Sequence, residues 1–155
     1  MAKKLNFDNI KQNTVKETYK MVVVEDANGE EYELKYKTRV SSNDTQKFLE
    51  RFIKYFEDWQ LDGSAQSEEF TTPIVSLNSA LITTITDIEV PDNKEEFVAF
   101  FVKLVELDLV ENIVLNFDTK VVDKLQTAIL NVMDFATKHV ESTIKTEKER
   151  QDNAE

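Results

Sequence analysis

The sequence contains no cysteine and a single histidine, His139. The lack of cysteine excludes disulfide bonds, thiolate metal sites and cysteine nucleophiles, and nothing indicates an oxidising compartment. A single imidazole cannot form a histidine-rich metal site. We therefore expect His139 to be an ordinary helix residue and the protein to bind no metal or other cofactor.

Glycine and proline are also scarce, with two residues of each among 155. Phosphate-binding and dinucleotide-binding loops need several glycines, and no Gly-x-Ser-x-Gly turn is present to hold a serine nucleophile. Carboxylates are abundant, but paired-carboxylate catalysis depends on a spacing in three dimensions that scattered residues do not reveal. We expect a protein with long helices that is not an enzyme.

Long apolar runs are missing as well. Even residues 97–117, the most apolar stretch, contain four charged side chains, whereas a membrane span needs about 20 uncharged residues. The polar residues that follow Met1 do not resemble a signal peptide, so we expect a cytoplasmic protein. The net charge of −11 repels the phosphates of nucleic acids and anionic lipids. Neither nucleic acid nor membrane is an expected partner.

The length predicts one globular domain, which we place at residues 1–144. Residues 1–17 are polar with isolated apolar side chains and are interpreted as an extended arm or short strand. Ile144 is the last large apolar residue of the chain, and residues 145–155 after it are densely charged. Such composition predicts a flexible tail.

An Asn-Gly pair between two alternating segments predicts a β-hairpin. Residues 18–25 are rich in β-branched and aromatic side chains, and residues 30–37 alternate between apolar and charged ones. Asn28 and Gly29 accept the positive φ angles that a tight turn requires. A calcium loop counted from Asp26 would need its glycine at the sixth position, but Gly29 stands fourth. We favour the hairpin.

Helical periodicity dominates the rest of the chain and predicts an α+β, mainly helical fold, in which the antiparallel hairpin precedes a bundle of about four helices. A first helix, capped near Ser41, places aromatic side chains on one stripe and ends at Gly63. The Thr-rich segment 71–86 fits a helix opened by Pro73 or a strand. A further helix is predicted over residues 94–107, with Asp92 as its cap. Residues 109–117 form a short helix or a buried connection. A final helix is predicted to begin at residue 119.

The predicted helix 94–107 has apolar side chains over an arc of roughly 220°. Phe97, Phe101, Leu104 and Val105 lie near the centre of this arc and are the expected core. Val102 and Leu107 lie near its edges. Because large exposed apolar patches mark interfaces, these two edge residues are the predicted protein-binding site.

The final helix has apolar residues at alternating spacings of three and four, which is heptad spacing. The series consists of Val122, Leu125, Ile129, Val132, Ala136 and His139. A coiled coil requires this pattern to persist over three or four heptads. We therefore expect one face of this helix to pack on its own domain.

Three features together resemble the tail assembly chaperones of long-tailed phages and prophages of Gram-positive bacteria. They are the hairpin through Asn28-Gly29 into residues 31–34, the aromatic helix 48–59, and the stretch 86–91 leading into Glu95, Glu96 and Phe97. The resemblance covers residues 18–140, except that the Thr-rich segment does not show the family pattern. It implies a helical chaperone that binds the tape measure protein and tail tube subunits during assembly in the bacterial host and then leaves the particle. The resemblance assigns no functional residue in this sequence.

Two other classes of non-catalytic protein fit the composition. An acidic inhibitor could imitate nucleic acid and occupy a basic groove, although the carboxylates are spread evenly along this sequence. A structural subunit or adaptor of a virion would instead self-associate through the helix at residues 94–107. Gene neighbourhood, between a tail tube gene and a long coiled-coil gene, would distinguish the chaperone from both.

Overall fold

The computed structural model describes Asn6, Asp8, Lys11, Lys16 and residues 18–61 and 72–152. The predicted arm at residues 1–17 therefore lies largely outside the described part of the chain. The predicted helix end at Gly63 and the loop that follows it also lie outside.

The predicted hairpin is confirmed. Strands β1 (Tyr19–Glu25) and β2 (Glu31–Lys37) pair antiparallel. Gly29 has a φ of 81°, in the left-handed region that glycine adopts without strain. The carboxylate of Asp26 closes the turn by accepting hydrogen bonds from the main-chain N–H groups of Asn28, at 2.8 Å, and Glu30, at 3.0 Å.

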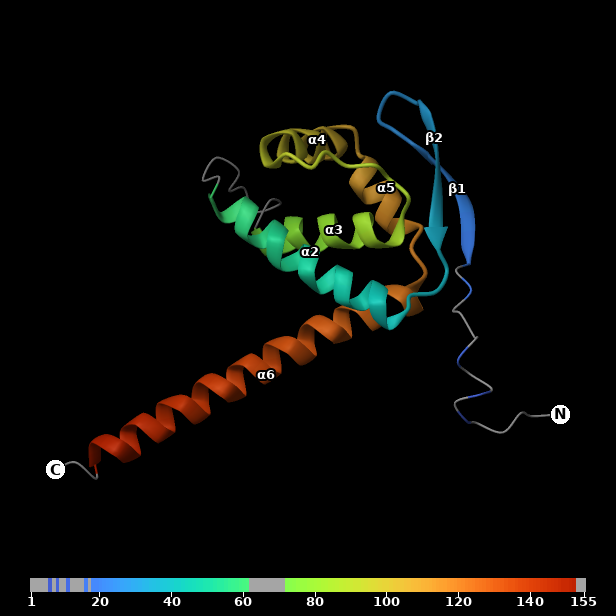
Figure 1. Ribbon diagram of the computed structural model, residues 1–155. Helices are drawn as coiled ribbons and strands as arrows, with labels where there is room; N and C mark the ends of the chain where they lie inside the picture. Colours follow the sequence, from blue (N-terminus) through green and yellow to red (C-terminus); the bar gives the residue numbers. More distant parts are fainter. Residues whose placement is uncertain are drawn as a thin grey trace.

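Five helices follow the hairpin in the described residues, which confirms the mainly helical α+β fold (Figure 1). Their bounds are α2 Ser42–Leu61, α3 Thr72–Ile85, α4 Lys94–Glu106, α5 Leu109–Leu115 and α6 Thr119–Asp152. Within the Thr-rich segment Thr72–Ile85 is helix, and the segment's last residue, Thr86, makes an isolated antiparallel bridge to Tyr36 of β2. The predicted cap of α4 is one residue too early, because Asn93, rather than Asp92, accepts from the N–H of Glu96 at 3.1 Å.

Stacked aromatic rings join α2 to α4 in the core. The rings of Tyr55 and Phe97 are parallel with centroids 4.5 Å apart, and those of Trp59 and Phe101 meet edge to face at 5.9 Å. Such pairs stabilise a core beyond the apolar area they bury. Of the residues predicted to be core on α4, Phe97, Phe101 and Leu104 are buried, while Val105 is only half-buried.

Tyr36 connects the hairpin to the helices. Its side chain is fully buried, its ring lies 5.4 Å from that of Phe117, and its hydroxyl donates a 2.9 Å hydrogen bond to the main-chain oxygen of Ile113 in α5. Burial raises the pKa of Tyr36 to about 12, so the hydroxyl keeps its proton at neutral pH. Tyr36 therefore joins the hairpin to α5, and Val24 of β1 is buried in the same core.

The last helix departs from the sequence-based prediction in two ways. One face packs on the domain only in its first turns, where Val121 and Leu125 are buried and Ile129 is half-buried. Beyond that point α6 projects away from the body (Figure 1). Residues 145–152, predicted as a flexible tail, continue this helix, because Lys, Glu, Arg and Gln are strong helix formers.

Candidate protein-binding surface

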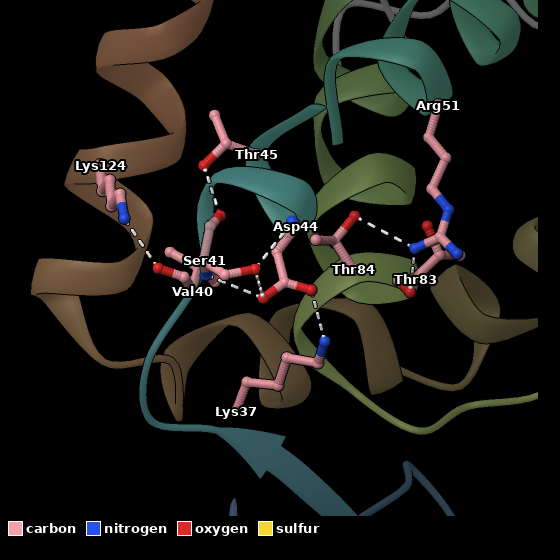
Figure 2. A network of polar contacts seen from close by, with 9 residues as sticks. All are labelled: Lys37, Val40, Ser41, Asp44, Thr45, Arg51, Thr83, Thr84 and Lys124. Atoms are coloured by element: carbon pink, nitrogen blue, oxygen red, sulfur yellow. Dashed lines mark hydrogen bonds and ion pairs between the residues drawn. The ribbon is translucent and has the colours of Figure 1, made fainter. Parts of the chain in front are cut away.

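A polar contact from Lys124 joins the base of α6 to the junction between β2 and α2. Lys124 donates from its Nζ to the main-chain oxygen of Val40 at 2.7 Å (Figure 2). At the start of α6 the carboxylate of Asp118 accepts from the N–H of Lys120 at 2.9 Å. The buried Leu125 lies nearly two turns beyond the start. The direction in which the helix leaves the body is thus fixed by both polar and apolar contacts.

The junction that receives Lys124 is itself an ordered network at the first turn of α2 (Figure 2). Lys37 pairs with Asp44 at 2.6 Å, and Asp44 accepts from the N–H of Ser41 at 2.9 Å while the hydroxyl of Ser41 accepts from the N–H of Asp44 at 3.2 Å. Burial alone would raise the pKa of Asp44, but the hydrogen bonds from Lys37 and Ser41 outweigh it and lower that pKa. Asp44 is therefore charged at neutral pH, as this reciprocal cap requires.

From residue 130 to residue 152 every side chain of α6 is exposed. The exposed fractions of the large apolar ones are 64% for Leu130, 47% for Val132, 59% for Met133, 74% for Phe135, 56% for Val140 and 49% for Ile144. Isolated apolar side chains are normal on a surface, but a row of them along one helix marks an interaction site. Six of the 13 large apolar side chains that are exposed in the described residues lie on this part of α6.

The charges of this segment occupy a narrow strip on the opposite side of the helix. At ~100° per residue, Asp134, Lys138, Glu141 and Lys145 fall within an arc of roughly 60°. Most uncharged side chains of residues 130–146 lie on the other side within roughly 200°, and Phe135 lies about 20° outside that arc, toward the charged strip. We call this surface the distal face; it consists of Leu130, Val132, Met133, Ala136, Thr137, His139, Val140, Thr143, Ile144 and Thr146.

The projecting helix also differs from the body in charge. Residues 119–152 contain six basic and six acidic side chains, so the other 13 basic and 24 acidic side chains carry the whole net charge of −11. Coulomb repulsion from the acidic body decays within about 8–10 Å at ordinary salt. A partner with either a positive or a negative net charge can therefore approach the distal part of α6.

The predicted binding residues Val102 and Leu107 do not form one surface of this kind. Both are half-buried and pack against the core. Leu107 lines an apolar groove of about 540 Å³ between β2 and α4, together with Leu34 and Phe100, whereas Val102 is not part of its lining. The main-chain oxygen of Leu107 also accepts from the N–H of Ala27 at 2.9 Å, which ties the hairpin turn to the end of α4.

The described residues offer little for other chemistry. Within residues 18–61 and 72–152 no three acidic, histidine or cysteine side chains gather around a possible metal position. No helix in that part of the chain has the length and apolar character needed to cross a membrane. His139 lies exposed on the distal face, with its ring parallel to that of Phe135 at 6.5 Å.

Comparison with known proteins gives no relative: no protein-family model, curated protein or solved structure matches this chain. The site must therefore be judged by its own geometry. The heptad spacing and the strip of charges were both present in the sequence. What sequence reasoning missed is that the domain covers the apolar positions only as far as Ile129.

Proposed function

We propose that this chain is a non-catalytic binding protein whose distal face packs against an apolar face of a helix in another protein. The observation that supports this most directly is the run of exposed apolar side chains from Leu130 to Ile144 on a helix anchored at its base. A rigid, preorganised helix presents its side chains without the entropic cost of first becoming ordered. Helix pairing through apolar residues spaced by three and four is a common mode of recognition.

The specific role that agrees with this surface and with the sequence resemblance is that of a phage tail assembly chaperone in the bacterial cytoplasm. Its partners would be the tape measure protein, whose long helices present apolar stripes, and tail tube subunits. The uncharged distal face matches such a stripe better than it matches a nucleic-acid-binding groove, which is rich in Lys and Arg. An acidic mimic would instead use the body, where the excess negative charge lies.

Co-expression with the products of neighbouring genes tests this proposal. We expect the tagged chain to retain a long helical tail protein, and the double variant Met133→Glu/Val140→Glu to retain at least ten times less. Lys138→Ala is the matched control on the charged strip, where only an exposed pair to Asp134 at 2.8 Å is lost. Capture of nucleases or polymerases through the body, with no tail protein bound, would overturn the proposal in favour of the acidic mimic.

A further inference from the structure

We infer that, when no other partner is bound, the distal face is covered by the distal face of a second copy of this chain in antiparallel orientation. This inference rests on the proposed function only in using the same surface. Exposed apolar rows of this length are unfavourable in water, so the free protein gains by covering them.

The residues of the distal face are complementary to themselves when one helix is reversed. Spacings of three and four make Met133 and Val140 one set of central positions, and Ala136 and Thr143 the other set. In an antiparallel pair centred on residue 138, Met133 faces Thr143 of the second copy and Val140 faces Ala136. Each large side chain then meets a small one, which is the arrangement that packs without voids.

The flanking positions fit the same antiparallel pairing, with their contacts centred one residue earlier, on residue 137. Leu130 lies beside Ile144 of the second copy, and Thr137 lies beside its own symmetry mate. A twofold axis makes every contact occur twice, because residue i meets residue j and j meets i. A parallel pair would instead place Ala136 against Ala136 and Met133 against Met133, which leaves a gap at one level and crowding at the next.

Charge selects the same orientation. The distal face is uncharged and α6 as a whole has no net charge, so two such helices do not repel each other. The two bodies do repel, since all of the net charge of −11 per chain lies outside α6. In the antiparallel pair the positions where α6 leaves each body, near Ile129, are about 18 residues or ~27 Å apart along the helix axis. That separation exceeds the screening length of about 8–10 Å, whereas a parallel pair would bring the bodies together.

In this antiparallel dimer the distal face is kept out of water while no partner is bound. A partner helix must displace the second copy, so capture of a partner and self-association compete for one face. A partner helix with a longer apolar stripe covers more of the distal face than the α6 helix of the second copy does. Release of the partner returns the chain to the dimer without leaving the row of apolar side chains in water.

Sedimentation equilibrium of the purified chain, with no partner present, tests the self-association. We expect twice the mass of one chain for the wild type and for Lys138→Ala, and the mass of one chain for Met133→Glu/Val140→Glu. Circular dichroism should show that all three remain folded, since the substituted side chains are exposed. A wild-type monomer even at near-millimolar concentration overturns the inference but leaves the proposed function standing if a tail protein is still captured.

Disulfide cross-linking then tests the orientation, and the absence of native cysteine makes each introduced thiol unique. We expect Thr137→Cys to cross-link with itself and a mixture of Leu130→Cys with Ile144→Cys to give the mixed dimer. Leu130→Cys alone should not cross-link, because the two thiols lie ~24 Å apart in the antiparallel pair. Cross-linking of Leu130→Cys alone, without the mixed product, would show a parallel pair and contradict the inference.

Discussion

The Nζ of Lys124 lies 2.7 Å from the main-chain oxygen of Val40, 84 residues earlier in the sequence, and this contact joins the base of α6 to the end of the hairpin. Replacing Lys124 by alanine removes a charge-assisted hydrogen bond to a carbonyl next to the core. We expect Lys124→Ala to lower the free energy of unfolding by about 1 kcal/mol. Urea unfolding measures this loss, and Lys120→Ala, at an exposed position one turn earlier, should leave the midpoint unchanged.

The two parts of α6 should contribute very differently to stability. Leu125 is fully buried, so Leu125→Ala should cost about 2–5 kcal/mol of folding stability. Among the described residues, a chain that stops after Leu130 loses only side chains that are exposed in the single copy. Its thermal midpoint should stay close to that of the monomeric variant Met133→Glu/Val140→Glu. A large loss of stability on truncation would mean that the distal part packs on the body.

The aromatic contact between α2 and α4 should be one of the main sources of stability. Phe101 is 3% exposed and meets both Trp59 and Phe97. We expect Phe101→Ala to cost about 3–5 kcal/mol, because its removal leaves a cavity among aromatic rings that cannot all move into it. Calorimetry would measure the change. A cost below about 1 kcal/mol would show that α4 packs less tightly than these ring distances indicate.

The network around Asp44 predicts a dependence of stability on pH. The folded-state pKa of Asp44 lies below the model-peptide value of 3.8, so the unfolded chain takes up this proton first as the pH falls. The stabilising contribution is complete well above pH 3.8 and is lost as the pH falls through the folded-state pKa. Asp44→Asn should therefore be less stable than the wild type at pH 7, and the difference should shrink in acid. Asp134→Asn, in an exposed pair, should show no such difference at any pH.

Much of the fold follows from local signals in the sequence. The turn at Asn28 and Gly29, the start of α2 beside Ser41 and the range of α4 all depend on residues that are close in the chain, and the structure agrees with them. The helix over Thr72–Ile85 could not be decided locally, because threonines favour strands. The tertiary contacts decide it: Leu81, Ile82 and Ile85 are buried together against neighbouring elements.

The candidate site was harder to predict, because it depends on which of two apolar helices the domain can cover. The wide arc of α4 suggested Val102 and Leu107, yet Phe97 and Phe101 pack on α2 and these two edge residues are half-buried against the same core. The heptad spacing of α6 suggested packing on the domain. A periodic pattern shows which side of a helix is apolar, but not where along its length the neighbouring elements end.

The affinity of matched variants for one partner tests the central claim that the distal face is the binding site. The measurement is the dissociation constant for the captured tail protein, by biolayer interferometry on folded proteins. We expect Met133→Ala/Val140→Ala to weaken binding by at least tenfold, or about 1.4 kcal/mol, and Val102→Ala/Leu107→Ala to leave it within a factor of about two. The reverse order, with binding lost at Val102 and Leu107 and kept at Met133 and Val140, would contradict the claim and place the site beside the groove between β2 and α4.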